Sequence, residues 1–198
     1  MVASVPIVVI DTMTFSYLQG LGQLALLAHL GASTGRLRVT NAVLGQLHRS
    51  GTLGRYAQSM CDRGEIGRVK VVLADPISAE VRRVLEGKHG ALVRRNRVDV
   101  ELVEVARQHA GYVLSCERGI AQLAKRRHVS SIDLLVLFCW AIELHLLSEK
   151  QVEEATRAWS TSAAPGTGAP ADWAGTFADT RKARPDLDEV VGALLATK

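Results

Sequence analysis

A short apolar run near the start of this chain, stopped by an aspartate, constrains its fold more than any other feature. Ile7 to Ile10 are continuous and β-branched, and Asp11 follows them directly. A half-exposed strand alternates apolar and polar residues, whereas a continuous run is typical of a strand buried on both faces of a parallel sheet. The run is too short for a signal peptide, so we expect no export by that route. A buried parallel strand with a carboxylate at its end is predicted.

Strand-like and helix-like segments alternate along the chain after this run. Further strands are expected at residues 36–40, 69–73 and 112–115, and helices at residues 21–30, 41–47, 56–63, 76–85, 99–110 and 120–127. Gly31 is expected to end the first helix, and Asn41 to cap the second. A helical pair, 132–146 and 149–159, should follow, with Ser148 and Gln151 as a capping box. The fold class predicted is α/β: an open parallel sheet flanked by helices in three α/β/α layers.

The composition changes near residue 160, which divides the chain into a domain and a tail. With 47% hydrophobic residues in 198, the chain can bury a full core, which we assign to residues 1–159. Residues 160–198 begin with a stretch rich in Ala, Gly, Pro and Ser that has no periodicity, so a flexible tail is predicted. A short terminal helix is expected at residues 186–196.

Membrane insertion and disulfide-based folds are disfavoured. The longest apolar tract, residues 132–147, includes Asp133, Glu143 and His145 and is shorter than the roughly 20 residues that cross a bilayer. The three cysteines form no CxxC pair, which indicates neither a disulfide framework nor a thiolate zinc site. We therefore expect a cytoplasmic protein with no membrane segment. The net charge of +4 is compatible with a polyanionic partner without indicating one.

Common catalytic signatures are missing from the sequence. It contains no Walker loop, nucleophile elbow, zinc-protease HExxH or kinase motif. Gly20 and Gly22 form a lone GxG without the third glycine of a dinucleotide site, so we interpret them as turn residues. The histidines have no metal-ligand spacing on a helix.

Three acids remain at informative positions. Asp11 ends the first strand, Asp99 opens a helix, and Glu117 follows the strand at 112–115. Ligands of open parallel sheets bind at the carboxyl ends of the strands, where these acids are expected to meet. Clustered carboxylates bind Mg²⁺ or Mn²⁺ and suit phosphoryl chemistry. The alternative is that Asp11 is a strand-end cap, Asp99 an ordinary helix N-cap and Glu117 a first-turn acid of its helix.

Four stretches of the sequence surround these acids: VVIDT (8–12), VTNAVLGQL (39–47), VDVELVEVA (98–106) and VLSCERGIAQLA (113–124). Through these stretches, residues 5–158 resemble the PIN domain family. The resemblance implies a metal-dependent endoribonuclease related to toxin nucleases. Asp11, Asp99, Glu117 and Gln46 would be its catalytic positions, and the three acids would bind Mg²⁺ or Mn²⁺. RNA would then be the partner on which the protein acts. An inhibitory, antitoxin-like protein and a second copy of the chain in a homodimer are further partners to consider. The expected location is the cytoplasm.

Two positions depart from the family pattern. Gln46 stands where the family usually has an acid, and Ser115-Cys116-Glu117 stands where it usually has TxD. Gln46 allows three explanations: a natural loss of activity, an introduced substitution, or another acid acting in its place. The spare acids are Glu65, Asp75, Glu101 and Glu104. The alternative function is accordingly a catalytically impaired PIN-like module that binds RNA or a protein.

Two basic clusters are candidates for phosphate contacts. They flank the proposed acidic centre and consist of Arg94, Arg95, Arg97 and of Lys125, Arg126, Arg127. Both clusters could instead be solvated helix ends. Aromatic residues make up only 5% of the chain, so base stacking is poorly supported.

Overall fold

A five-stranded, all-parallel sheet forms the centre of the computed structural model, which describes residues 6–72, 75–86 and 97–162. Its strands are β1 (Val8–Ile10), β2 (Leu37–Thr40), β3 (Gly67–Val69), β4 (Tyr112–Leu114) and β5 (Ser130–Ile132). The strand order is β3-β2-β1-β4-β5. The predicted α/β class is confirmed. The predicted helix at 186–196 and all of the predicted tail after residue 162 lie outside the described residues.

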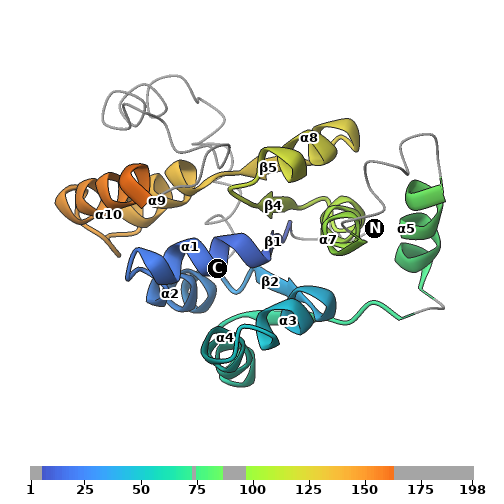
Figure 1. Ribbon diagram of the computed structural model, residues 1–198, viewed down its shortest axis with the longest axis horizontal. Coiled ribbons are helices and arrows are strands. Elements are labelled where there is room, and N and C mark those ends of the chain that lie inside the picture. The colour runs from blue at the N-terminus through green and yellow to red at the C-terminus, as the bar shows by residue number, and fades with distance from the viewer. Residues whose placement is uncertain (1–5, 73–74, 87–96, 163–198) are drawn as a thin grey trace.

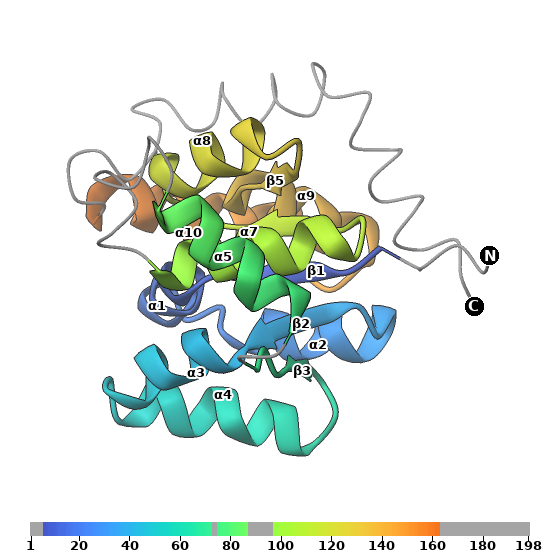
Figure 2. The same ribbon diagram turned by 90° about the vertical axis from the view of Figure 1, so that its right-hand side faces the viewer.

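Helices cover both faces of this sheet. They are α1 (Thr12–Gly20), α2 (Ala25–Thr34), α3 (Asn41–His48), α4 (Thr52–Asp62), α5 (Pro76–Glu86), α7 (Arg97–Gln108), α8 (Arg118–Arg126), α9 (Leu134–Glu143) and α10 (Glu149–Ser162). In Figure 1, α1, α2, α9 and α10 lie on one side of the strands, and α7 lies on the other. Helix α5 packs against α7 on the side away from the sheet (Figure 2). The arrangement is the expected three-layer sandwich.

β1 is the central strand because every residue in it is apolar. Val8, Val9 and Ile10 are all 0% exposed. Val9 pairs with Arg38 of β2 on one side and with Val113 of β4 on the other. From β1 the chain first builds β2 and β3 toward one edge, and it then crosses back to build β4 and β5 toward the other. The chain therefore leaves β1 toward one edge of the sheet and leaves β4 toward the other edge. The switch point lies between β1 and β4, and this is where an open α/β sheet forms a ligand crevice.

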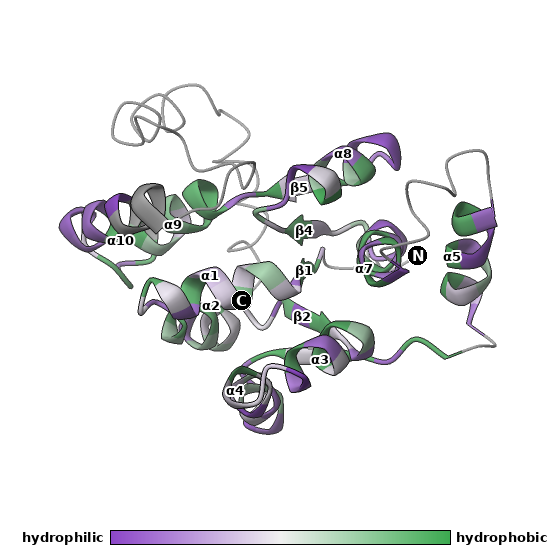
Figure 3. Cartoon of the chain, in the orientation of Figure 1, coloured by the Kyte–Doolittle hydropathy of each residue, from purple (hydrophilic) through white to green (hydrophobic). Residues whose placement is uncertain are grey.

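The strands at the centre are coloured as hydrophobic in Figure 3, and the helices around them carry both hydrophobic and hydrophilic residues. Helix α9 is the most apolar, and its residues from Leu134 to Ala141 are all buried. The predicted capping box before α10 is confirmed, because the Gln151 amide donates to Ser148 Oγ (3.3 Å) and the Ser148 amide donates to Gln151 Oε1 (2.9 Å). Asp75 also opens α5 as expected, accepting from the Ile77 amide at 2.9 Å. Among the described residues, no helix is long and apolar enough to cross a membrane.

Several element boundaries differ from the prediction. Helix α1 was not predicted, and the strand expected at 69–73 instead ends at Val69. β5 was missed as well, because only one of its three residues, Ile132, is apolar. Helix α10 continues beyond residue 159 to Ser162. The N-cap of α3 is Thr40, whose Oγ1 accepts from the Val43 amide at 3.3 Å, so the prediction of Asn41 as the cap is wrong.

Gly31 is not the end of α2, as the sequence suggested. The helix continues to Thr34, and Gly35 is its left-handed C-cap at φ 65°. A Cβ atom on Gly31 would lie 1.8 Å from the Glu65 carbonyl oxygen. Gly31 is therefore required by a close approach of backbone to the helix, a constraint that helical periodicity does not reveal.

Candidate functional site

The four predicted catalytic positions line one cavity. Asp11, Gln46, Asp99 and Glu117 come from four separate segments of the chain and surround a volume of about 200 Å³. Asp11 follows β1 and Glu117 follows β4, so the cavity lies at the switch point of the sheet. Its remaining lining residues are Thr12, Met13, Val43, Val98, Leu102 and Ile120. The cavity thus has three carboxylates, one amide and a largely apolar wall.

Asp11 is fixed by the elements that meet at the end of β1. Its side chain is only 2% exposed, and its Oδ1 accepts from the Thr14 amide at 2.7 Å as the N-cap of α1. Thr14 in turn donates through Oγ1 to the Leu114 carbonyl at 3.3 Å. Asp11 thus caps a helix that was not predicted, and this capping role does not exclude a role in the cavity. A carboxylate has about four lone-pair positions, and a cap uses one of them.

Ser115 connects the ends of β1 and β4. Its hydroxyl donates to Asp11 Oδ2 at 2.7 Å and accepts from the Glu117 amide at 3.0 Å. This buried hydroxyl holds the Asp11 carboxylate in one orientation and ties the backbone of Glu117 to it. Glu117 is the N-cap residue of α8 but makes no side-chain capping bond. Its carboxylate therefore remains available to the cavity.

Burial raises the pKa of both strand-end acids. Desolvation raises the pKa of Asp11 from 3.8 to about 6, against the opposing effect of its bonds from Ser115 and Thr14. The negative charge of Glu117 adds to the rise. Burial likewise raises the pKa of Glu117. Two neighbouring carboxylates with raised pKa values are a common feature of functional sites.

Gln46 projects from α3 and is held by Thr12, the residue after Asp11. Thr12 Oγ1 donates a hydrogen bond to Gln46 Oε1. Both side chains line the cavity. The position that departs from the family pattern is therefore part of the site.

Asp99 reaches the cavity from the first turn of α7. The helix begins two residues earlier than predicted, at Arg97, so Asp99 lies inside the helix. Its neighbour Val98 lines the same cavity, as does Leu102 one turn later. An acid in the first turn of a helix is favoured by the helix dipole.

The spare acids do not line the cavity. Glu65 pairs with Arg63, Asp75 caps α5, and Glu104 pairs with Arg107 at 2.7 Å. Glu101 is 8% exposed, and burial raises its pKa despite the opposing effects of the Thr40 side chain and the Arg97 charge. No spare acid thus stands beside Gln46 among the residues lining the cavity.

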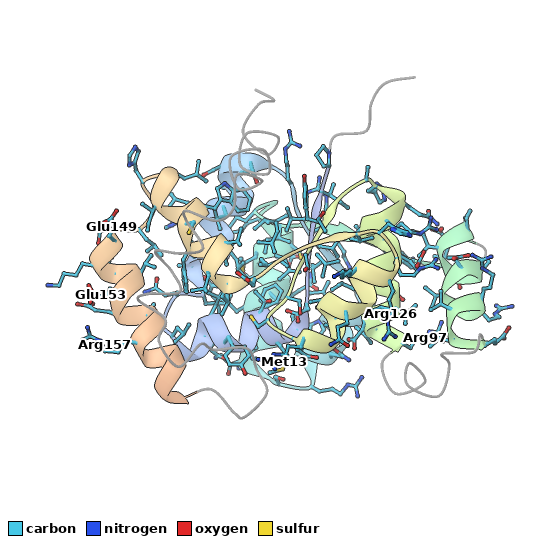
Figure 4. The ribbon with its side chains drawn as sticks, turned by 90° about the horizontal axis from the view of Figure 1, so that it is seen from above. Met13, Arg97, Arg126, Glu149, Glu153 and Arg157 are labelled. Carbon is cyan, nitrogen blue, oxygen red and sulfur yellow. The ribbon has the colours of Figure 1, made fainter. Side chains whose placement is uncertain are left out.

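The basic residues that were predicted to contact phosphate differ in their surroundings. Arg94 and Arg95 lie outside the described residues, whereas Arg97, Lys125 and Arg126 are exposed. Figure 4 labels Arg97 and Arg126 toward the same side of the molecule, with Glu149 and Glu153 of α10 toward the opposite side.

Arg127 already has two carboxylate partners. It pairs with Glu104 of α7, at 2.6 Å, and with Glu80 of α5. These ion pairs connect the end of α8 with α5 and α7, and the Glu104 carboxylate is 0% exposed. Because its guanidinium already binds two protein carboxylates, Arg127 is less available to a phosphate than Lys125 or Arg126.

The carboxylate oxygens around the cavity are of the kind that a hard divalent cation binds. Carboxylate oxygens from three segments surround one cavity, and oxygen is the ligand that Mg²⁺ and Mn²⁺ prefer. Two of these carboxylates have raised pKa values, which a nearby cation would lower. Within the described residues, no three or more His, Cys, Asp or Glu side chains stand close enough together to hold a metal ion. The donors therefore surround the cavity without forming a closed coordination shell.

Sequence reasoning missed the polar partners of the acids. Ser115, Thr12 and Thr14 were not proposed as site residues, although each contacts a predicted one. Ser115 is the first residue of the SCE motif and Thr12 is the last residue of the VVIDT motif, so their place in these motifs was a signal in the sequence. Cys116 is buried beside Thr14, and burial raises the pKa of its thiol well above the ordinary value.

No protein-family model, curated protein or solved structure matches this chain.

Proposed function

We propose that this protein is a metal-dependent endoribonuclease of the PIN type. The observation that carries the proposal is the meeting of Asp11, Asp99 and Glu117 on one cavity at the switch point of a parallel sheet. Asp11 and Glu117 follow adjacent parallel strands, and Asp99 reaches the same cavity from a separate helix. A cavity with several carboxylates and, among the described residues, no basic lining residue attracts cations.

Asp11, Asp99 and Glu117 would hold Mg²⁺ or Mn²⁺. Such an ion, when bound, activates a water for attack and stabilises charge on the phosphate. Ser115 and the Thr14 amide orient Asp11, which keeps lone pairs for a further ligand. Val43, Leu102 and Ile120 give the cavity an apolar wall. Arg97, Lys125 and Arg126 would contact the RNA backbone from the surface.

A toxin-like role would add a protein that covers the cavity until the nuclease is needed. We propose that the protein acts in the cytoplasm, where RNA is available as a substrate. The free thiols of Cys61, Cys116 and Cys139 are consistent with that location, because the cytoplasm keeps thiols reduced. A homodimer is compatible with this role.

The test is cleavage of single-stranded RNA in Mn²⁺ by the wild type and by Asp11→Asn, Asp99→Asn and Glu117→Gln. Each variant should lose at least about a hundredfold in rate, since even indirect partners of metal ligands contribute about 10- to 100-fold. Asn is as good an N-cap as Asp, so Asp11→Asn should keep α1 intact. The matched control is Asp62→Asn on α4, an exposed carboxylate bonded only to Gln58 at 2.6 Å. Rates that stay at the wild-type value in all three variants would exclude this site.

Gln46 supports a second candidate, a catalytically impaired module that binds RNA or a protein. A neutral amide stands in the cavity where the family pattern has a fourth acid, and the described acids form no closed metal cluster. In that case the wild type should bind RNA without cutting it, and Gln46→Glu should produce cleavage. Cleavage by the wild type that depends on Asp99 would exclude this candidate.

A further inference from the structure

We propose that Gln46 is a substrate-binding residue that donates its amide N–H to a non-bridging phosphate oxygen of the substrate, and that Thr12 fixes it in this orientation. This inference rests on the proposed nuclease function. It differs from the family resemblance, in which the residue at this position is an acid.

The hydrogen bond from Thr12 determines which end of the amide is available. Thr12 Oγ1 donates to Gln46 Oε1, so the oxygen of the amide faces a donor. The nitrogen, Nε2, lies on the other side of the same planar group and carries two N–H donors. In the described part of the chain no acceptor bonds to Nε2. The side chain thus offers a donor to the cavity where an acid would offer a negative oxygen.

The charges around the cavity make a donor useful at this position. Asp11, Asp99 and Glu117 already provide three carboxylates, and no lysine or arginine of residues 6–72, 75–86 or 97–162 lines the cavity. A phosphodiester entering this space brings a further negative charge, which a fourth carboxylate would repel. A neutral amide removes that repulsion and adds a hydrogen bond to an anion, one of the stronger kinds of hydrogen bond in proteins.

The two chemical roles of Gln46 predict opposite responses to substitution. A residue that binds the metal through Oε1 should lose metal affinity when truncated, whereas a residue that binds phosphate through Nε2 should lose RNA affinity. Gln46→Glu separates them further. It adds a negative oxygen, which strengthens metal binding and weakens the binding of a phosphodiester.

The experiment measures two affinities in Gln46→Ala, Gln46→Glu and Thr12→Val. Mn²⁺ binding is measured by titration without RNA. Binding of a short fluorescein-labelled RNA of mixed sequence is measured by anisotropy in Ca²⁺, with a gel to confirm that the RNA stays intact. The control is Gln122→Ala, an exposed glutamine on α8. Thermal unfolding confirms that each variant is folded.

For Gln46→Ala we expect an RNA dissociation constant about tenfold higher and Mn²⁺ affinity within about twofold of the wild type. Gln46→Glu should bind Mn²⁺ more tightly and RNA more weakly. Thr12→Val should weaken RNA binding by less than Gln46→Ala, because the amide can then turn.

Three results would overturn the proposal: loss of Mn²⁺ affinity in Gln46→Ala, unchanged RNA affinity in Gln46→Ala, or tighter RNA binding in Gln46→Glu. A wild type that binds neither Mn²⁺ nor RNA would instead mark the failure of the proposed function, and the inference would fail with it.

Discussion

At the scale of single residues, the site depends on how Asp11 is held. One residue ends β1, caps α1 and faces the cavity, and the Ser115 hydroxyl fixes its second oxygen. The sequence alone could predict the position of Asp11, because a continuous apolar run stopped by an acid is a local pattern. It could not predict the partner, because Ser115 lies more than a hundred residues away and meets Asp11 only through the pairing of β1 with β4.

The buried carboxyl of Asp11 predicts a pH-dependent stability in metal-free protein. Its pKa is raised to about 6 in the folded chain, chiefly by burial, and is near 3.8 when exposed. Between these values the folded chain keeps a proton that the unfolded chain releases, so the free energy of unfolding should fall as pH rises from about 4 to about 6. The full contribution is roughly 3 kcal/mol. Urea unfolding in EDTA across this range measures it.

Asp11→Asn provides the comparison for this pH dependence. An amide does not titrate, so the variant should lose most of the decrease in stability between about pH 4 and about pH 6, while Glu101 and Glu117 still contribute theirs. An identical pH profile in the wild type and the variant would show that Asp11 is not buried as a carboxylate.

At the scale of secondary-structure elements, ion pairs fix the helices that carry the site. Glu104 of α7 is fully buried and accepts from Arg107 at 2.7 Å and from Arg127 at 2.6 Å. Arg127 also pairs with Glu80, so α5, α7 and α8 share one network. Because α7 carries Asp99 and Glu117 caps α8, this network positions two of the three acids.

Arg127→Met should destabilise the fold, whereas Arg126→Met should not. Removing Arg127 leaves a buried carboxylate with one partner, which we expect to cost roughly 2–3 kcal/mol. Arg126 is exposed, so its substitution should change stability by less than about 0.5 kcal/mol. Urea unfolding of the two variants measures both effects. If the two variants have the same free energy of unfolding, the ion pairs of Arg127 do not stabilise the fold.

At the scale of the whole molecule, the sequence predicted the fold class and the meeting of the acids from one topological rule. The carboxyl ends of parallel strands share one edge, so acids that follow β1 and β4 are bound to be neighbours. The missed elements lacked a local signal. Helix α1 depends on the Asp11 cap and on the burial of Phe15 and Leu18, and two of the three residues of β5 are serines. Likewise, the approach of Glu65 to Gly31 comes from packing between distant segments.

The most direct test of the account is Mn²⁺ binding by the purified chain, measured by calorimetric titration near pH 7.5, where Asp11 is ionised. The wild type should bind Mn²⁺. Asp11→Asn, Asp99→Asn and Glu117→Gln should each weaken that binding by at least about tenfold, while Asp62→Asn should not change it. Mn²⁺ affinity that none of the three substitutions alters, or a folded wild type that binds no divalent cation, would contradict a shared metal site at the end of β1 and β4.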